Sequence, residues 1–253
     1  MADARFRTRM LGGEILAGTF FKTPAYELVE VLAKSGLDFI CLDAEHAPFD
    51  RARMDACLAV ARALGFPALV RVPTGTPVEI LKALDAGAAG VVVPHVDGVE
   101  KARAIARAAH FGEGGRGFAG STRSAGYATR GMADVLAGDA ETIVIAQIEE
   151  PSGVEACEAI AAVDGIDGLF VGPADLAVCY GVTDQASGPV RDAMERVGQA
   201  ARAEGKAFMT FAADAAEAGP RLRALGVTTF FVASGHAFML KGARAAAEAL
   251  HGL

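Results

Sequence analysis

Eight short apolar runs, separated by segments of helical period, constrain the fold of this chain more than any other feature of its sequence. The predicted strands cover residues 14–19, 38–43, 67–72, 90–93, 142–149, 167–171, 207–212 and 228–233. Segments such as PAYELVEVLAKSG and GVEKARAIARAAH lie between them and read as helices, several with proline at the first position or glycine just past the end. Apolar strands that are each followed by a helix favour a parallel sheet covered on both faces.

Eight such units in about 250 residues is the usual size of a (β/α)8 barrel, or TIM barrel. The sequence therefore predicts a single α/β domain over residues 1–253. A doubly wound open sheet is the alternative, because one misread unit would leave seven strands. The longest irregular stretch, residues 111–130, is rich in glycine and is expected to form a functional or interface loop.

Composition narrows the classes of function. Hydrophobic residues make up 52% of the chain, which is ample for a packed core, and the net charge is −7 with no basic cluster. Nucleic acid and anionic membranes are therefore poor candidates as partners. The N-terminus lacks the apolar region of a signal peptide, and no apolar run approaches the ~18 residues of a membrane span. We expect a soluble, cytoplasmic protein whose four cysteines are free thiols: Cys41, Cys57, Cys157 and Cys179.

Polar side chains stand at the predicted carboxyl ends of several strands, which all meet at one mouth of a TIM barrel. They are Asp43, Glu45, His46, Arg71, Gln147, Glu149 and Asp175. Strand alternation places Gln147 and Glu149 on one face and the apolar residues 144, 146 and 148 on the other, so the polar pair should point inward. An inward glutamate is costly unless it is paired or binds a cation. A salt bridge to Arg71 is the alternative, and Glu150 is expected to cap the next helix.

Asp175 lies in the first helical turn after Pro173, where an acidic residue also simply complements the helix dipole. Together with Glu149 it provides two carboxylates, the usual ligands of Mg²⁺-like ions. Asp43 is placed to accept the ring N–H of His46 and leave the other nitrogen for proton transfer. Arg71 offers a rigid fork of donors for a carboxylate or an enolate oxygen.

Other candidates are interpreted as structural. Lys22 is expected to be an exposed loop residue, and no lysine ends the strands near 145, 170 or 210, so a Schiff-base mechanism is weakly supported. The glycine motifs at 112–117 and 115–120 follow no predicted strand, so no dinucleotide or other organic cofactor is expected. The remaining histidines share no ligand-like spacing: His95, His110, His236 and His251.

The motifs LDAEHAPFD, LVRVP, DAGAAGVVVPHVDGVEKA, GGRGFAGSTRSAGY, AQIEEPSGVE, VDGIDGLFVGPADLAVCYG and TTFFVASG, in this order, resemble those of the HpcH/HpaI aldolase family. The resemblance covers about residues 12–245. Such proteins are class II pyruvate aldolases, similar to 4-hydroxy-2-oxoheptanedioate and 2-keto-3-deoxy sugar-acid aldolases. The resemblance implies metal-dependent aldol cleavage or condensation of 4-hydroxy-2-oxo acids, giving pyruvate or hydroxypyruvate plus an aldehyde through a metal-stabilised enolate.

The resemblance also implies roles for individual residues. Glu149 and Asp175 match the metal-binding carboxylates, and the ion is expected to be Mg²⁺, Mn²⁺ or Co²⁺. Arg71 matches the arginine that contacts the keto oxygen of pyruvate. His46 matches the acid/base histidine, oriented by Asp43.

Further positions follow from the same comparison. Gln147 matches a residue near the metal and substrate, and the backbone of Gly172, Pro173 and Ala174 is expected to hold the substrate carboxylate. Asp85 matches an acidic residue contributed at a subunit contact. Arg123 is expected to contact either the acceptor aldehyde or a neighbouring subunit. Relatives are hexamers, trimers of dimers that exchange a C-terminal helix, here AFMLKGARAAAEALHGL.

Three rival functions stay open. A lyase of acyl-CoA esters, similar to citryl- and malyl-CoA lyases, would call for a basic groove that the sequence does not show. A phosphosugar isomerase or epimerase would bind phosphate through glycine-rich loops after the last two strands, where VASG is only a faint match. A non-catalytic binding barrel is disfavoured by the number of polar residues at the strand ends.

Overall fold

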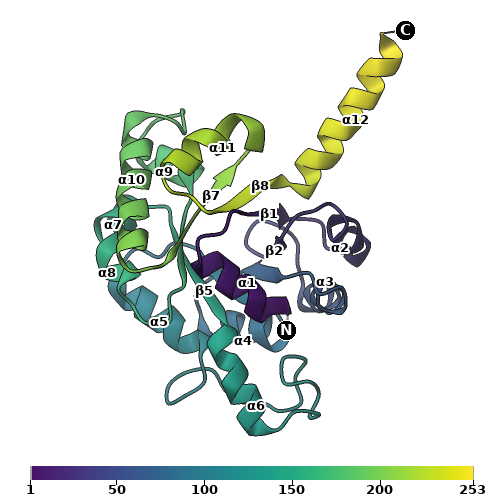
Figure 1. Cartoon of the computed structure of the whole chain (residues 1–253), viewed down its shortest axis with the longest axis vertical. Coiled ribbons are helices and arrows are strands. Elements are labelled where there is room, and N and C mark those ends of the chain that lie inside the picture. Colours follow the sequence, from purple (N-terminus) through teal and green to yellow (C-terminus); the bar gives the residue numbers. More distant parts are fainter. Residues whose placement is uncertain (1, 253) are drawn as a thin grey trace.

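The computed structural model, which describes residues 2–252, is a closed barrel of eight parallel strands (Figure 1). The strands pair in chain order, and the first closes against the last. They are β1 (Leu16–Phe21), β2 (Phe39–Asp43), β3 (Ala68–Arg71), β4 (Gly90–Val93), β5 (Ile143–Ile148), β6 (Gly168–Val171), β7 (Ala207–Ala212) and β8 (Thr229–Ser234). The predicted (β/α)8 barrel is confirmed, and the open sheet is wrong.

The largest error in a strand boundary concerns β1, which begins and ends two residues later than predicted. Glu14 belongs to the preceding turn, where both of its carboxylate oxygens accept hydrogen bonds from Arg9 at 2.8 and 2.9 Å. Phe20 and Phe21 continue the strand and are both buried. Successive side chains of a strand point to opposite faces of the sheet. Phe20 and Phe21 are therefore buried on opposite faces, and their burial extends the strand beyond its predicted end.

Helices surround the barrel on its outer face. They are α2 (Tyr26–Leu32), α3 (Arg51–Ala63), α4 (Pro77–Asp85), α5 (Val99–Ala109), α6 (Met132–Ala137), the 3₁₀-helix η1 (Gly138–Glu141), α7 (Pro151–Glu155), α8 (Cys157–Ala161), α9 (Pro173–Cys179), α10 (Gly188–Ala203) and α11 (Ala215–Ala224). The predicted proline in the first turn is present in α4, α7, α9 and α10. Asp50 caps α3 by accepting the backbone N–H of Arg53 at 2.8 Å. Residues 111–130 contain no helix or strand, as predicted.

The interior of the barrel is filled largely by aromatic rings. The ring centroid of Phe231 on β8 lies 5.0 Å from that of Phe20, 5.1 Å from that of Phe39 and 4.7 Å from that of Phe170. Gly18 on β1 makes room for this packing, because a Cβ there would lie 2.3 Å from the ring of Phe39. The rings thus form a dense interior beneath the carboxyl ends of the strands.

An N-terminal helix, α1 (Ala2–Leu11), seals the opposite end of the barrel and was not predicted from the sequence (Figure 1). Phe6 and Met10 are buried among the inward-facing residues of the strands. Arg7 ties the helix to the barrel through an ion pair of 2.7 Å with Asp167, just before β6. Within the described residues, α1 therefore covers the end of the barrel opposite the carboxyl ends of the strands.

The C-terminal helix α12 (Gly235–His251) extends away from the barrel (Figure 1). None of its residues is buried, and four large apolar side chains on it are exposed: Phe238, Met239, Leu240 and Leu250. An amphipathic helix whose apolar side chains are exposed needs a partner surface to bury them.

Two expectations from composition can be compared with the structure. Within residues 2–252, no helix has both the length and the apolarity needed to span a bilayer. The four cysteines are free, as expected, with Cys179 exposed and the other three buried.

Candidate active site

A cavity of about 310 Å³ opens at the carboxyl ends of the strands. It is lined by Phe20, Lys22, His46, Arg71, Gln147, Phe170, Gly172, Pro173, Ala174, Asp175, Phe211, Ala233 and Ser234. Seven of the predicted site residues are among them. The phenylalanines were missed by the sequence analysis, although Phe20, Phe170 and Phe211 end inward-facing rows of β1, β6 and β7.

Arg71 on β3 and Asp43 on β2 form a buried ion pair at the floor of this cavity. The Asp43 Oδ1 and Oδ2 atoms accept from the Arg71 Nε and terminal nitrogen at 3.0 and 2.8 Å. Burial alone would raise the pKa of Asp43, but the hydrogen bonds and charge of Arg71 outweigh it, so this pKa lies below its usual value. Lys22 adds a second cation 3.2 Å from Asp43 Oδ2. The expectation of Lys22 as an exposed loop residue is therefore wrong.

The expected hydrogen bond from the His46 ring to Asp43 does not form. Asp43 Oδ1 instead accepts the backbone N–H of His46 at 3.1 Å, because its carboxylate is already turned toward Arg71. The His46 ring is 58% exposed, and its Nε2 lies 3.7 Å from Glu45 Oε2. Glu45 in turn lies 3.2 Å from Arg71 Nε. Arg71 is thus paired with Asp43 and Glu45, and the alternative salt bridge from Arg71 to Glu149 is wrong.

Gln147 and Glu149 follow the inward-facing row of β5, as strand alternation predicted. Their neighbours 143 and 145 lie inside the barrel, while 144, 146 and 148 pack against the helices. Glu149 is only 3% exposed, and Gln147 Nε2 donates to its Oε2. Burial raises the pKa of Glu149, a sign that its charge lacks full compensation. Gln147 Oε1 is buried and has no hydrogen-bond partner within the described part of the chain.

Glu149 and Asp175 converge on one point beside Gly172. A Cβ added to Gly172 would lie 3.1 Å from Asp175 Oδ2 and 3.3 Å from Glu149 Oε2, so both oxygens face the same small volume. Asp175 also occupies the first turn of α9, where it complements the helix dipole. Two carboxylate oxygens, one of them buried, together with the unpartnered oxygen of Gln147, form a donor set suited to a hard divalent cation.

His95, interpreted from the sequence as structural, lies at this site. Its ring Nδ1 is 3.2 Å from Glu149 Oε1 and 2.9 Å from Glu150 Oε1, and its backbone N–H donates to Glu149 Oε1 at 2.7 Å. Ligand atoms of Glu45, His95 and Glu149 lie within 4.8 Å of one another. The strand-end rule would have found His95, which follows β4 directly, had it been applied to that strand. Glu150 is the N-cap residue of α7, as predicted, but its side chain makes no capping hydrogen bond.

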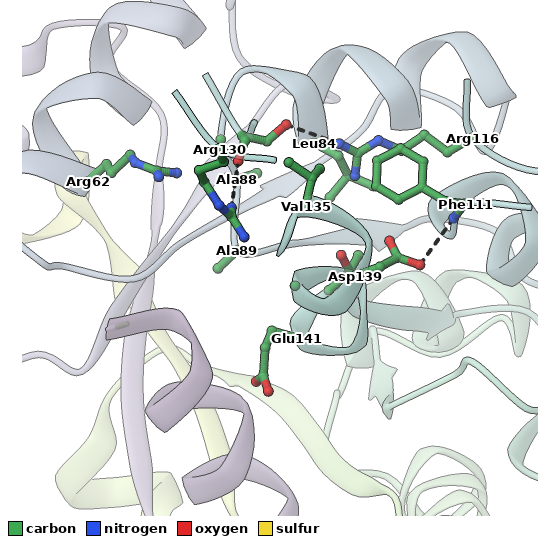
Figure 2. A pocket seen from close by; sticks show the side chains of 14 residues that line it. Arg62, Leu84, Ala88, Ala89, Phe111, Arg116, Arg130, Val135, Asp139 and Glu141 are labelled. Atoms are coloured by element: carbon green, nitrogen blue, oxygen red, sulfur yellow. Dashed lines mark hydrogen bonds between the residues drawn. The ribbon is translucent and has the colours of Figure 1, made fainter. Parts of the chain in front are cut away.

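Asp85 does not join the other predicted residues within its own chain. It ends α4 at the opposite end of the barrel. A second cavity of about 440 Å³ lies there, lined by the adjacent Leu84 and by Arg116 among others (Figure 2). Arg116 donates to Asp85 Oδ1 and to Ser124 Oγ, both at 3.1 Å. A role for Asp85 therefore depends on a neighbouring subunit and stays a prediction. Arg123 also lies at this end, paired with Asp55 of α3 at 2.7 Å.

Comparisons with known proteins identify the family of this chain. The model of the family described as HpcH/HpaI aldolase/citrate lyase matches residues 16–238. A hydroxypyruvate/pyruvate aldolase from Roseovarius nubinhibens is 34% identical over 206 residues, covering 79% of this chain and 80% of that protein. A 5-keto-4-deoxy-D-glucarate aldolase from an Enterobacter species is 36% identical over 205 residues, covering 80% and 79%.

Solved structures separate near from distant relatives. A HpcH/HpaI aldolase/citrate lyase family protein from Burkholderia cenocepacia superposes with a TM-score of 0.92 at 33% identity, covering 98% of this chain and 99% of that one. The citrate lyase β subunit of Mycobacterium tuberculosis reaches a TM-score of only 0.57 at 18% identity and shares the fold alone. The chain therefore belongs to the HpcH/HpaI aldolase/citrate lyase family and is a carbon–carbon lyase.

Proposed function

We propose that the chain catalyses the metal-dependent cleavage and formation of 4-hydroxy-2-oxo acids, with pyruvate or hydroxypyruvate as one product and an aldehyde as the other. The observation that carries this proposal is the convergence of Glu149 and Asp175 beside Gly172, in the cavity that Arg71 enters. The names of two relatives, a hydroxypyruvate/pyruvate aldolase and a 5-keto-4-deoxy-D-glucarate aldolase, support the substrate class.

Glu149 and Asp175 are the proposed ligands of Mg²⁺, Mn²⁺ or Co²⁺. The donor set fits such an ion, since Glu149 is buried without a lysine or arginine partner among the described residues, and the Gln147 amide oxygen beside it is unpartnered. When bound, the ion would act as a Lewis acid toward the keto and carboxylate oxygens of the oxo acid.

Arg71 is the proposed donor to the substrate oxygen that gains negative charge as the carbon–carbon bond breaks. Asp43 and Glu45 fix the guanidinium on one side, and Phe20 lies beneath it with the guanidinium carbon 4.4 Å from the ring centroid. A donor held in place before the reaction need not reorganise during it, which is the main source of electrostatic catalysis.

Substrate carboxylate binding is assigned to the backbone of Gly172, Pro173 and Ala174. These residues begin α9, where the first N–H groups of a helix have no partner within the helix. Pro173 has no N–H and the Gly172 N–H donates to Ile148 O at 3.1 Å, so the Ala174 N–H is the group proposed to donate to the carboxylate. Gly172 and Pro173 are buried, so the segment forms a fixed wall of the cavity.

His46 is proposed to take the proton of the C4 hydroxyl during cleavage and to return it during condensation. Its exposed ring can reach a substrate at the cavity mouth. Glu45, in place of Asp43, is the carboxylate proposed to orient the His46 ring, because its Oε2 lies 3.7 Å from Nε2.

The rival reading as a lyase of acyl-CoA esters has less support. Lys22 and Arg71, the lysine and arginine that line the cavity, are both paired with Asp43. Among the described residues no further lysine or arginine lines the cavity, so the basic cluster that the phosphates of coenzyme A call for is missing. Phe20, Phe170 and Phe211 make part of the wall apolar, which favours a small substrate screened from water.

A homo-oligomer, a hexamer built as a trimer of dimers, completes the proposal. The exposed apolar side chains of α12 would be covered by a second copy, and Asp85 would reach a neighbouring cavity. The reduced state of the four cysteines fits the cytoplasm. Light scattering of the full chain tests the assembly, and a monomeric mass contradicts it.

Exchange of the pyruvate methyl protons with D₂O, followed by NMR, tests the function. Protein stripped with EDTA is measured with and without Mn²⁺ or Mg²⁺, and E149Q serves as the matched variant. We expect exchange that requires metal and falls on the order of 100-fold or more in E149Q, beyond the effect of losing an outer-shell contact. Absence of exchange with every metal in folded wild-type protein overturns the proposal, and turnover of a coenzyme A ester would then replace it.

A further inference from the structure

His95 adopts a backbone conformation that is uncommon for residues other than glycine. Its φ of 55° lies in the left-handed region, in the loop between β4 and α5. Such a residue persists where its surroundings hold it, and it often marks a functional position. Both backbone polar groups of His95 are engaged, the N–H with Glu149 Oε1 at 2.7 Å and the carbonyl oxygen with Lys101 Nζ at 2.5 Å.

The imidazole of His95 stands among three carboxylates. Its Nδ1 hydrogen-bonds Glu150 Oε1 at 2.9 Å and lies 3.2 Å from Glu149 Oε1. Its Nε2 lies 3.7 Å from Glu45 Oε1. Glu150 therefore holds the ring against the outer oxygen of Glu149.

These contacts give the two carboxylate oxygens of Glu149 different surroundings. Oε1 faces the backbone and ring of His95, whereas Oε2 accepts from Gln147 and faces Asp175 across Gly172. With Oε1 held by one N–H and a neighbouring ring nitrogen, Oε2 is the oxygen directed toward Gly172 and Asp175, which line the cavity. Outer-shell hydrogen bonds of this kind fix the orientation of metal-binding carboxylates.

We propose that His95 is a positioning residue for Glu149, setting Oε2 toward the point beside Gly172 where Asp175 also converges and where the divalent cation would be held. The proposal rests on the function proposed above. It goes beyond that function by assigning the strained conformation of His95 and the side chain of Glu150 to the metal site. His95 is not itself a proposed ligand.

The test is Mn²⁺ affinity, measured by electron paramagnetic resonance on EDTA-stripped protein without substrate. H95G removes the imidazole while also relieving the backbone strain, so its thermal midpoint without metal should not fall. We expect its dissociation constant for Mn²⁺ to rise 10- to 100-fold, roughly the size of an outer-shell effect. H95N keeps a side-chain donor and tolerates a positive φ, so it should bind closer to wild type than H95G.

Ala128 supplies a matched control, since its φ is 65° in the loop 111–130. A128G makes the same backbone change away from the cavity and should leave Mn²⁺ affinity unchanged. Mn²⁺ binding by H95G that equals or exceeds that of wild type overturns the role of His95 alone. Failure of wild-type protein to bind Mn²⁺ overturns the metal site itself, and the two failures are therefore distinguishable.

Discussion

Asp43 and Arg71 are direct neighbours in the barrel, paired in register at the carboxyl ends of β2 and β3 and joined by two hydrogen bonds of 3.0 and 2.8 Å. The pair is buried, so each side chain neutralises a charge that the interior would otherwise leave uncompensated. The carboxylate at the tip of β2 thus holds the arginine of the active site, which explains why an apolar strand ends in charge.

D43N should be costly for both stability and activity. Removing one partner of a buried ion pair lowers the free energy of unfolding by about 3–5 kcal/mol. Because Arg71 keeps its contact with Glu45, we expect a loss of about 3 kcal/mol. Urea denaturation measures the loss. D50N exchanges one good N-cap residue for another on α3 and should be almost neutral. An unfolding free energy of D43N equal to that of wild type would show that the pair contributes nothing.

H46Q should separate two proton transfers. If His46 serves the C4 hydroxyl, loss of this general base should lower aldol cleavage about 10²–10⁴-fold. Exchange of the pyruvate methyl protons, which involves no C4 hydroxyl, should fall much less. Cleavage is followed by the appearance of pyruvate, and exchange by NMR. Equal losses in both assays would assign His46 to a step that the two reactions share.

His110 should make stability depend on pH. The hydrogen bond from its Nδ1 to Asp139, 3.2 Å long, raises the pKa of His110 above its usual 6.5, and burial opposes it. A raised pKa in the folded state gives stability that is complete below 6.5 and is lost as the pH rises through the folded value. Thermal midpoints from about pH 5.5 to about pH 8.5 should therefore fall more steeply in wild type than in D139N. Parallel curves would refute the linkage.

G18A should disrupt the aromatic interior. The new Cβ would lie 2.3 Å from the Phe39 ring, which has no free volume to move into, so overpacking should cost about 1–3 kcal/mol. Gly242 in α12 offers the control, because a Cβ there meets nothing within 4 Å and no proline follows it. G242A should not lower stability, since alanine has the higher helix propensity. Equilibrium unfolding in urea compares the two, and a neutral G18A would mean that the interior is loosely packed.

The architecture was predictable because eight apolar runs alternate with helical periods; the largest displacement, of two residues, was in β1, and β8 was displaced by one. The helix α1 was missed because its contribution comes from two side chains, Phe6 and Met10, that enter the barrel interior. In a charged segment, the spacing of these two apolar side chains is too weak a pattern to predict a helix. Only the closed barrel creates the pocket that they fill.

Strand alternation predicted correctly that the side chains of Gln147 and Glu149 point inward. The hydrogen-bond partner of a side chain was harder to predict where residues of two neighbouring strands can both bind it. The sequence suggested that Asp43 would bind His46, three residues away, because no pattern shows that Arg71 sits beside it in register. The place of His95 was predictable, because it lies two residues beyond the end of β4. Its left-handed backbone conformation was not, because that conformation leaves no signal in the composition.

The first and last strands pair with each other, and the rings at the base of the barrel come from both ends of the chain. Phe6 of α1 lies 5.2 Å from Phe39, which in turn packs against Phe231 of β8. During synthesis this aromatic surface stays open until β8 leaves the ribosome, since no earlier strand can close the sheet against β1. Closure over so long a sequence separation is slow, so the aromatic surface is prone to aggregation until β8, in the last tenth of the chain, has emerged.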